Sequence, residues 1–559
     1  MKLRDYQSEC VDAVEAEWED HVSTLAVKPT GTGKTIVFAH LIKRALAKYP
    51  DARVMVIAHR KELLRQAADK IKAVIPDVLV DMEMGDFWAD GGVRQAPVIV
   101  SSVQTQNAGR NGDLRMKRFD PDQFSMLVID EAHHAAADSY RRLIDWYKQN
   151  PFLRVLGVTA TPDRHDEMAL GQVFESVAFD WEINDAIKKG WLVPVLANQV
   201  LVEGLDFSAC RTTAGDLNGA DLDEILREEK MLHKVTRPVW ELSNGRKTLL
   251  FGTSRIQAER MCEILNRYTN NCACYIDGTT PTDQREDLLL RYERGEYQFL
   301  VNVGIATEGF DIPGIEVVVP KPTKSRSLFA QMIGRGTRPV PGLVDQHDTP
   351  AARREAIESS AKPFMEVIDL CGVAGRHKLI HSADVLGGKY QDETVELATK
   401  LASERDGPAD MSYLLEQADE QQQARERAQA EKEERDRRRR DAARTRHHVV
   451  GKAKFTFSKV SLFDTLDLHP ARERQWDVDK QLSDKQKDML EKQGIDPGSM
   501  SYAEGRTVIN ELFRRWKKHL ATPKQIRLLK KHQWYSDELT VEQASSRIDA
   551  IAKNNWRKP

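Results

Sequence analysis

The sequence is poor in cysteine and in long apolar runs, and it carries almost no excess of either charge. Six cysteines are scattered over 559 residues, which excludes a disulfide-stapled fold and predicts reduced thiols. The close pair Cys272 and Cys274 has no second pair at zinc-ligand spacing, so we expect no zinc site there. The 83 lysines and arginines nearly balance the 86 aspartates and glutamates, so any charge-driven binding must be local.

No apolar run approaches the ~20 residues that a membrane-spanning helix needs, and the first ten residues lack the apolar core of a signal peptide. We therefore expect a soluble, cytoplasmic protein with no membrane partner. The chain has 41% hydrophobic residues and can bury several cores. At roughly 150 residues per domain, its length predicts three or four domains.

Short β-branched runs recur through the first 380 residues, each followed by a turn and a stretch of helical periodicity. This alternation is typical of parallel α/β units, and it predicts two doubly wound parallel-sheet domains in tandem. The expected strands are 25–27, 54–58, 98–100, 126–129 and 155–158 in the first domain, and 248–251, 299–303, 316–319 and 366–369 in the second.

Two segments differ in composition from these units. Residues 203–230 are acidic and polar with three glycines, which predicts an exposed insertion or connection rather than a core strand. Residues 412–446 are almost entirely Glu, Gln, Arg, Ala and Asp, which predicts a solvated helix or a flexible tether. A nucleic-acid or nuclear-localisation patch is the alternative for this second segment.

The last 80 residues contain an internal repeat at an offset of about 39 residues. Each unit holds two capping boxes, in which a hydroxyl accepts from a helix-start amide and a Glu or Gln side chain three residues later reaches back. We therefore expect a tandem pair of helical hairpins. The four boxes are Ser483 with Gln486, Ser501 with Glu504, Thr522 with Gln525, and Thr540 with Gln543.

The end of the chain is locally basic. Residues 501–559 contain 13 Lys and Arg against 6 Asp and Glu, as a phosphate-binding surface would. Trp516, Trp534, Tyr535 and Trp556 lie among these charges. Core packing of the tryptophans is favoured over base stacking, and a protein partner for residues 448–559 is equally compatible with the sequence.

A glycine-rich turn between an apolar strand and an apolar-periodic helix, LAVKPTGTGKT, predicts a phosphate-binding loop. Glycines let its backbone close round an anion, Lys34 can reach the β- and γ-phosphate oxygens, and the Thr35 hydroxyl can ligate Mg²⁺. Lys28 departs from the generic pattern, which has glycine there. The expected ATP-binding residues of the loop are Pro29, Thr30, Gly31, Thr32, Gly33, Lys34 and Thr35.

The segment MLVIDEAH at 126–133 predicts a buried strand that presents Asp130 and Glu131 at its carboxyl end. At that edge of a parallel sheet Asp130 can hold Mg²⁺ through water, and Glu131 can orient and deprotonate the attacking water. The segment QMIGRGTR at 331–338 offers Arg335 and Arg338, which share a face if the segment is helical. Phosphoryl transfer needs positive charge that stabilises its transition state, and a second lobe can supply this charge when it closes. Together with the phosphate loop and the acidic pair, these arginines predict ATP and Mg²⁺ as cofactors.

In this order, GTGKT, DEAH, TATP, ATEGFD and QMIGRGTR resemble the motifs of a superfamily 2 helicase of the DEAH/DExH type. The resemblance is nearest to the branch that contains type III restriction motors and excision-repair helicases, with phage or bacterial character, and it covers about residues 1 to 380. It implies two RecA-like domains, at 1–185 for ATP binding and 186–390 for the helicase C-terminal domain. A charged helical linker at 391–447 and an all-α repeat domain at 448–559 follow. The spelling PTGTGKT suits this family, which accounts for Lys28.

The resemblance also implies roles for individual residues. Arg4 and Gln7 would contact the adenine base, and Arg335 and Arg338 would act as arginine fingers. His133 and Gln331 would link the nucleotide state to the interface between the lobes. Coupling of hydrolysis to motion would use Thr159 and Thr161. Nucleic acid would contact Arg60, Gln104, Thr105, Thr253, Thr307 and Gly309.

Three further histidines, His134, His377 and His381, have no carboxylate or cysteine at metal-like sequence spacing, so we expect structural roles for them. The sequence favours an ATP-dependent helicase or translocase acting on single- or double-stranded DNA, with RNA as a less favoured substrate. Alternatives are a duplex-DNA translocase subunit of a restriction, repair or defence complex, and an RNA helicase. A different class is an ATP-switched adaptor that acts through its C-terminal repeats.

Overall fold

The structure is a computed structural model, and it describes most of the chain. The described residues are 2–89, 95–110, 113–160, 164–213, 215–305, 312, 314–373, 378–405, 407–445, 468, 477, 480–493, 495–532, 534–536 and 538–554. The chain forms two compact units, Met1–Gly388 with Asp392–Glu420, and Lys389–Gln391 with Gln421–Pro559. Within the described residues, no helix combines the length and the apolar character needed to cross a membrane.

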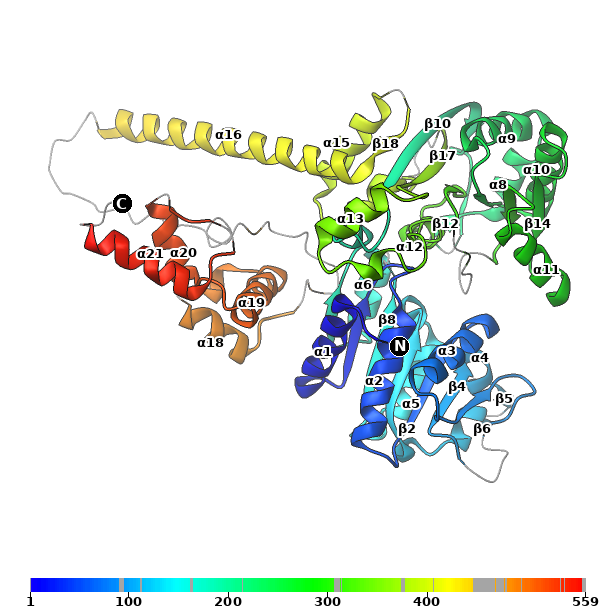
Figure 1. The fold of residues 1–559 in the computed structure, drawn as a ribbon, viewed down its shortest axis with the longest axis horizontal. Helices are drawn as coiled ribbons and strands as arrows, with labels where there is room; N and C mark the ends of the chain where they lie inside the picture. The colour runs from blue at the N-terminus through cyan, green and yellow to red at the C-terminus, as the bar shows by residue number, and fades with distance from the viewer. Residues whose placement is uncertain are drawn as a thin grey trace. The chain divides into compact units, whose positions relative to one another are not determined.

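The first lobe is built on a seven-stranded sheet in which every pair of neighbours is parallel (Figure 1, blue to cyan). Its strand order is β3 (Val80–Glu83), β4 (Val98–Ser102), β2 (Arg53–Ala58), β7 (Phe124–Asp130), β8 (Arg154–Thr159), β1 (Ser23–Val27) and β9 (Ser176–Asp180). The helices are α1 (Asp5–Asp20), α2 (Lys34–Lys48), α3 (Lys61–Val74), α4 (Val103–Gln106), α5 (Asp138–Tyr147), α6 (Arg164–Gly171) and α7 (Ile183–Lys188). Strands β1, β2 and β4 are fully buried, as strands covered on both faces must be.

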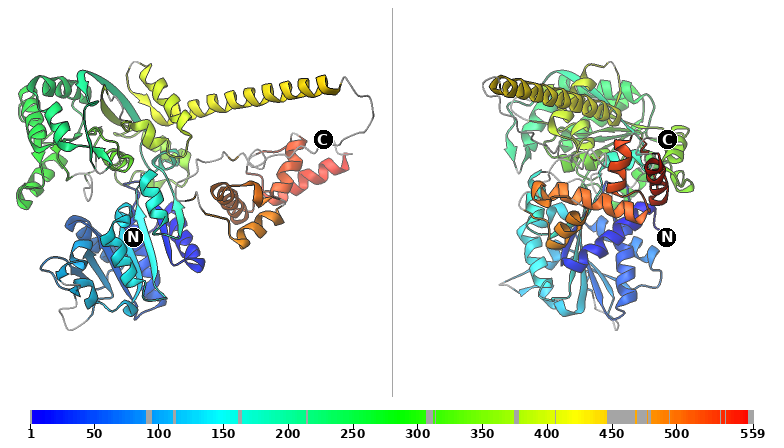
Figure 2. Two further views of the ribbon diagram at one scale, coloured as in Figure 1. Left: turned by 180° about the vertical axis from the view of Figure 1, so that it is seen from behind. Right: turned by 90° about the vertical axis from the view of Figure 1, so that its left-hand side faces the viewer.

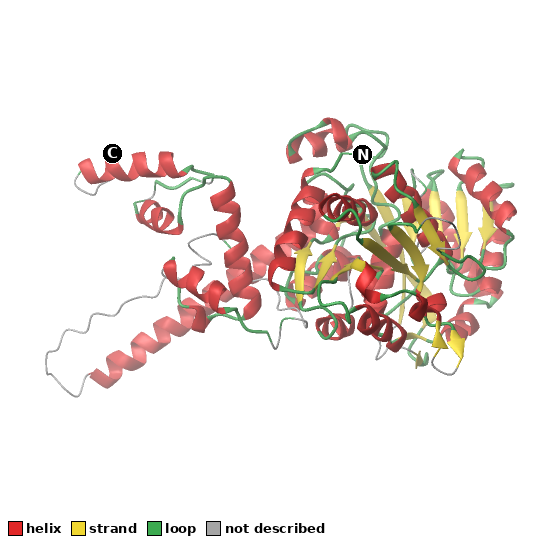
Figure 3. Ribbon diagram, turned by 90° about the horizontal axis from the view of Figure 1, so that it is seen from below, coloured by secondary structure: helices red, strands yellow, loops and turns green. Residues whose placement is uncertain are grey.

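The second lobe repeats this plan (Figure 1, green). Its strand order is β14 (Ala273–Ile276), β15 (Phe299–Asn302), β13 (Thr248–Phe251), β16 (Val317–Val319), β17 (Met365–Val373), β10 (Val195–Asp206) and β18 (Ala409–Asp410), and only β18 is antiparallel to its neighbour. The helices are α8 (Gly219–Leu226), α9 (Glu229–Ser243), α10 (Arg255–Tyr268), α11 (Thr282–Glu293), α12 (Arg326–Ile333), α13 (Pro350–Glu358), α14 (Ser382–Leu386) and α15 (Asp392–Ser403). Figure 3 shows helices on both sides of the strands, and the prediction of two tandem RecA-like α/β domains is confirmed.

Each strand expected from the sequence is present, but several strands lack a strong sequence pattern. For example, β3 is short and only partly buried at the edge of its sheet, so its residues do not form an apolar run. In β14 the run ACYI is only four residues long. Such short edge strands form because a neighbouring strand offers hydrogen-bonding partners, which local propensity does not reveal.

Residues 203–230 differ in part from the expected exposed insertion, because some of them belong to the core of the second lobe. The first residues of this segment complete β10, and α8 follows a small hairpin of β11 (Thr212–Thr213) and β12 (Asp216–Leu217). Leu205, Phe207 and Leu222 are buried in the core of the second lobe. Polar residues between these apolar ones lower the mean hydropathy of the segment and conceal its buried face.

The compact first unit extends past residue 390, where the sequence placed the start of a linker. Ala409 and Asp410 form β18 and pair with β10, and the unit ends at Glu420. The charged segment is one helix, α16 (Met411–Thr445), which Figure 2 shows as a continuous rod. Leu414 and Leu415 near its start are buried, whereas the middle of the helix is exposed.

The second unit contains the two expected hairpins. Its helices are α18 (Asp484–Lys492), α19 (Tyr502–Lys517), α20 (Pro523–Lys531) and α21 (Val541–Lys553). All four capping boxes are formed, as the sequence predicted. Trp534 packs against the helical core, but Trp516 is 42% exposed, so the prediction of core packing is wrong for Trp516. Trp556 lies outside the described residues.

Candidate functional site: the phosphate loop between two lobes

The phosphate loop joins β1 to α2 in the conformation that the sequence predicts. Gly31 and Gly33 have φ of +85° and +76°, values that residues with a Cβ rarely adopt. The helix α2 begins at Lys34, directly after Gly33. The amides at this helix start therefore face the position where a phosphate group would bind.

Lys28 directly follows β1, at the start of the loop segment, and is fully buried. Its ammonium nitrogen is 4.7 Å from the centre of the Tyr6 ring and 5.8 Å from that of Phe179. Burial lowers the pKa of Lys28 to about 8, since a low-dielectric environment disfavours the charged form. The departure from glycine at this position therefore fits a lysine that packs among aromatic rings.

The acidic pair lies beside the loop because β7, β8 and β1 are neighbours with parallel direction. Lys34 Nζ donates to Glu131 Oε1 at 3.2 Å, and both side chains are largely buried. Asp130 Oδ1 accepts a hydrogen bond from the backbone N–H of Glu131. Glu131 has φ of +50°, an uncommon backbone conformation for a residue with a Cβ.

His133 and Thr159 lie in contact at the ends of two adjacent strands. His133 Nδ1 lies 3.0 Å from the Thr159 hydroxyl, and it is 3.5 Å from Glu131 Oε2. The carboxylate therefore connects Lys34 of the loop to His133, and His133 connects to Thr159. Thr161 lies outside the described residues.

The second lobe places its arginine segment against the phosphate loop. A Cβ added to Gly31 would lie 3.1 Å from Arg338 Cγ and Nε, and one added to Gly334 would lie 2.7 Å from Thr30 Cβ. Gln331 and Arg335 are buried in and just after α12. Burial lowers the pKa of Arg338 to about 10, which leaves its guanidinium charged at neutral pH.

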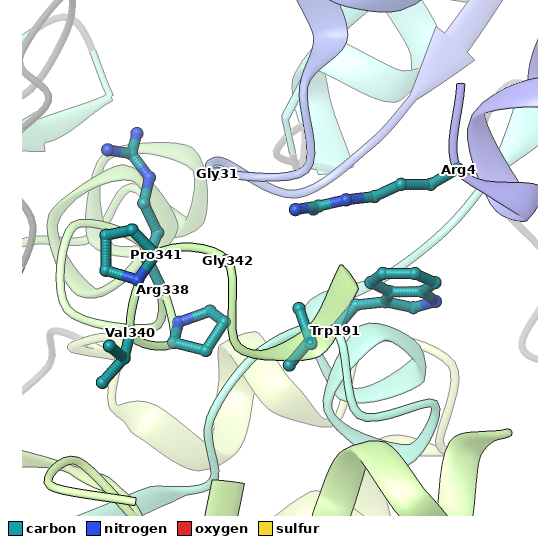
Figure 4. A pocket seen from close by; sticks show the side chains of 9 residues that line it. Arg4, Gly31, Trp191, Arg338, Val340, Pro341 and Gly342 are labelled. Carbon is teal, nitrogen blue, oxygen red and sulfur yellow. The ribbon is translucent and has the colours of Figure 1, made fainter. Parts of the chain in front are cut away.

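A cavity of about 350 Å³ opens beside this contact. Figure 4 shows Arg4 above the Trp191 ring at one side of the cavity, with Gly31 and Arg338 at the other. The Arg4 guanidinium carbon is 5.0 Å from the Trp191 ring centre, and Arg4 also pairs with Asp345 at 2.7 Å. The cavity is of a size and polarity that suit a flat base with an attached phosphate chain.

Gln7 contacts the loop itself. Its side-chain amide donates to the Thr32 carbonyl at 3.2 Å, and its oxygen accepts from the Arg4 backbone N–H at 3.0 Å. Tyr6 donates to the same Thr32 carbonyl at 3.1 Å. These bonds join the start of the chain to the phosphate loop.

Sequence reasoning missed three residues of this site: Trp191, Asp345 and Lys362. Lys362 Nζ donates to the Arg338 carbonyl at 2.7 Å, and burial lowers the pKa of Lys362 to about 7. Trp191 and Lys362 lie in irregular segments, and Asp345 lies in the short 3-10 helix Val344–Gln346. No local sequence pattern marks any of the three as a partner of the loop or of Arg338. Only a Gly-Trp step after a short helix could have drawn attention to Trp191.

The expected nucleic-acid contacts have varied environments. Arg60 donates to the Gly304 carbonyl of the second lobe at 2.8 Å, and Gln104 is exposed. Thr105 is buried, and its hydroxyl accepts from the Gly85 N–H at 3.1 Å, which makes it a support for a loop. Thr253 lies just after β13 and is half-buried. Thr307 and Gly309 lie outside the described residues.

His381 has no carboxylate or cysteine at metal-like sequence spacing, but the tertiary structure brings both kinds of residue close to it. Its Nδ1 lies 2.6 Å from Asp369 Oδ2, and potential ligand atoms of Asp369, Cys371 and His381 all lie within 4.8 Å of one another. Burial lowers the pKa of His381, but hydrogen bonds with Asp369 and Cys371 outweigh this effect and raise the pKa to about 11. The short distance between His381 and Asp369 is that of an ion pair. His377 lies outside the described residues.

This pair gives a pH-dependent prediction. Because the pKa of His381 is higher in the folded chain, its stabilisation is complete below about pH 6.5 and declines as the pH rises towards 11. We expect His381→Gln to lower the free energy of unfolding by about 1–3 kcal/mol at pH 6 and by less at pH 10. Urea unfolding of both chains across this range measures the difference, and a difference that stays constant with pH would contradict the assignment.

The residues at the loop fit both expected cofactors. The turn with two glycines at positive φ suits a phosphate chain. The hydroxyl of Thr35 and the carboxylate of Asp130 are hard oxygen donors, as Mg²⁺ prefers. When bound, Mg²⁺ would neutralise charge on the phosphate oxygens.

Comparisons with known proteins agree with this geometry. Residues 1–164 match the family "Type III restriction enzyme, res subunit", and residues 227–339 match "Helicase conserved C-terminal domain". IRC3 of Saccharomyces cerevisiae, named as an ATP-dependent helicase, is 32% identical over 349 residues, which cover 60% of this chain and 49% of that protein. The DNA 3'-5' helicase XPB of Mycobacterium tuberculosis is 28% identical over 349 residues, 60% of this chain and 58% of the other. The chain thus spans about half the length of these curated relatives.

A solved structure supports the fold. The type ISP restriction-modification enzyme LlaBIII bound to DNA has a TM-score of 0.50 and 15% identity, and the match covers 73% of this chain and 31% of that chain. Together with the ordered motifs, the two domain matches agree with the resemblance of the two lobes to superfamily 2 helicases, near the branch of type III restriction motors and excision-repair helicases.

Proposed function

We propose that the chain is an ATP-driven translocase or helicase that moves along DNA. The observation that carries the proposal is the contact of Arg338 with Gly31, which brings a cation of the second lobe to the phosphate loop of the first. A charge supplied across a closing cleft couples nucleotide hydrolysis to relative movement of the two lobes.

The side chains suggest how hydrolysis proceeds. The adenine base enters the cavity beside Arg4 and Trp191, and the phosphates lie against the loop. Phosphate oxygens compete with Glu131 for the ammonium of Lys34, which releases the carboxylate. Glu131 then orients a water molecule and accepts its proton as the water oxygen bonds to the γ-phosphorus and the bond to the β-phosphate oxygen breaks.

Two further roles are the stabilisation of transition-state charge and the coupling of hydrolysis to movement of the lobes. Arg338 and Arg335 stabilise the negative charge that develops on the transferred group. His133 is within reach of both Glu131 and Thr159, so it can transmit the state of the carboxylate to the end of β8. The name of the relative XPB, a DNA 3'-5' helicase, supports DNA over RNA as the substrate.

Steady-state ATP hydrolysis tests the proposal. The rate is measured alone and with single-stranded DNA, duplex DNA or RNA, and the Glu131→Gln chain serves as the blank. We expect the rate to rise severalfold with DNA, and the better DNA form separates a helicase from a duplex translocase. Hydrolysis that ignores every nucleic acid would contradict the proposal and favour a core that a protein partner gates.

A further inference from the structure

A loop after β3 presents two aromatic side chains that the known motifs do not include. Phe87 is 53% exposed and Trp88 is 56% exposed, although large aromatic side chains are mostly buried in folded domains. Neither contributes to the phosphate site. Two adjacent exposed rings on a protein surface indicate a binding function.

Residues 84–87 of this loop are firmly held. Met84 and Phe87 exchange backbone hydrogen bonds of 3.0 and 2.9 Å around Gly85, whose φ is +56°. Arg115 donates to the carbonyl oxygens of Gly85 at 2.6 Å and of Phe87 at 2.7 Å, and it also pairs with buried Glu83. Rings on a fixed loop lose little conformational entropy when a ligand binds.

Trp88 lies against two cations. The guanidinium carbons of Arg115 and Arg118 are 3.5 and 4.5 Å from the centre of its ring. Glu83 pairs with both arginines, so their positions are fixed. The stack orients the indole ring, and because Trp88 remains 56% exposed, a flat ligand can reach it.

The neighbours of this loop indicate which ligand it takes. Gly85 donates to Thr105, and Lys61 Nζ lies 6.0 Å from the Phe87 ring. The lysine can contact phosphates, and it lies beside a ring that can stack on a base. A duplex keeps its bases stacked on one another, whereas a single strand offers them.

We propose that Trp88, with Phe87 beside it, is a base-stacking platform for a single-stranded nucleic acid that crosses the first lobe. This inference rests on the proposed function, because it assigns a strand contact to the same motor. It also supplies a candidate element that holds unpaired bases.

The test uses the full chain and a fluorescein-labelled oligothymidylate, with binding followed by fluorescence anisotropy. We expect Trp88→Ala to weaken binding roughly 5- to 100-fold, the range that loss of one base–aromatic stack produces. Trp88→Phe keeps an aromatic face and should recover most of the affinity. The matched control is Phe152→Ala, since Phe152 is 81% exposed in the same lobe and precedes the amino end of β8, whereas Trp88 follows the carboxyl end of the parallel edge strand β3. The affinity of Phe152→Ala for the oligothymidylate should equal that of the unmodified chain.

A second probe separates stacking from a general loss of structure. An oligonucleotide in which abasic sugars replace the bases keeps its phosphates, so the unmodified chain and Trp88→Ala should bind it equally. Two results would overturn the platform. One is equal affinity of both chains for oligothymidylate, and the other is a loss of affinity in Trp88→Ala that is as large for the abasic strand as for oligothymidylate. If the unmodified chain binds neither DNA nor RNA, the proposed function itself fails, which is a distinguishable result.

Discussion

Replacing Glu131 by Gln is expected to lower the rate of ATP turnover by about 10²–10⁴-fold, the usual contribution of a general base. The amide has nearly the same shape as the carboxylate but cannot accept the proton of the attacking water. It also ends the ion pair with Lys34, whose nitrogen lies 3.2 Å from Glu131 Oε1. Nucleotide binding should therefore persist or strengthen while hydrolysis is lost. Release of inorganic phosphate and the affinity for a fluorescent ATP analogue measure the two effects separately.

A matched control uses Glu19→Gln, which makes the same chemical change at an exposed position near the end of α1. Its turnover should equal that of the unmodified chain. The expected loss of rate is at least about 100-fold. The assignment of Glu131 as the base would therefore be wrong if Glu131→Gln kept more than about a tenth of the original rate.

Replacing Arg338 by Ala is expected to have an effect of similar size or larger. An arginine finger contributes about 10³–10⁵-fold to phosphoryl transfer. Arg338 lies against Gly31, and a cation at this position is best able to stabilise charge that appears only in the transition state. We therefore expect kcat to fall much more than the affinity for ATP. Arg338→Lys should recover little, since the ammonium group lacks the planar fork of the guanidinium.

Arg354 offers the matched control for Arg338, because it is an exposed arginine of α13 in the same lobe. Arg354→Ala should leave kcat unchanged. Should Arg338→Ala instead raise KM for ATP with kcat unchanged, Arg338 would be a ground-state phosphate contact and not a finger.

Much of the fold could be predicted from the sequence because its cues are local. The strands 54–58 and 126–129 are continuous apolar runs, and both are present as parts of β2 and β7. The four helix starts of the C-terminal hairpins depend on side chains three residues apart, and all four formed. The segment 203–230 was misjudged in part because its mean composition conceals Leu205 and Phe207, which are buried in the core of the second lobe.

Some residues of the candidate site could be predicted from the sequence, and others could not. Lys34, Asp130 and Glu131 follow strands whose order is typical of the α/β fold, so their proximity could be anticipated. The partners of Arg4 could not be anticipated, because Asp345 is 341 positions away and Trp191 lies in an irregular segment. The same holds for His381, whose carboxylate partner Asp369 comes from β17.

The sequence by itself therefore determined the chemistry that the chain carries: a phosphate loop, an acidic pair, two arginines and a capped helical repeat. Glycine placement, capping and apolar spacing act between residues that are near in the chain, so they are legible without the fold. Only the tertiary structure decided which of these groups meet, including Arg338 at Gly31 and Trp88 on its two arginines. Those contacts arise when sheets and lobes bury their apolar faces. The hydrophobic effect that drives this burial is non-directional, so the individual residues that it brings together carry no local sequence pattern.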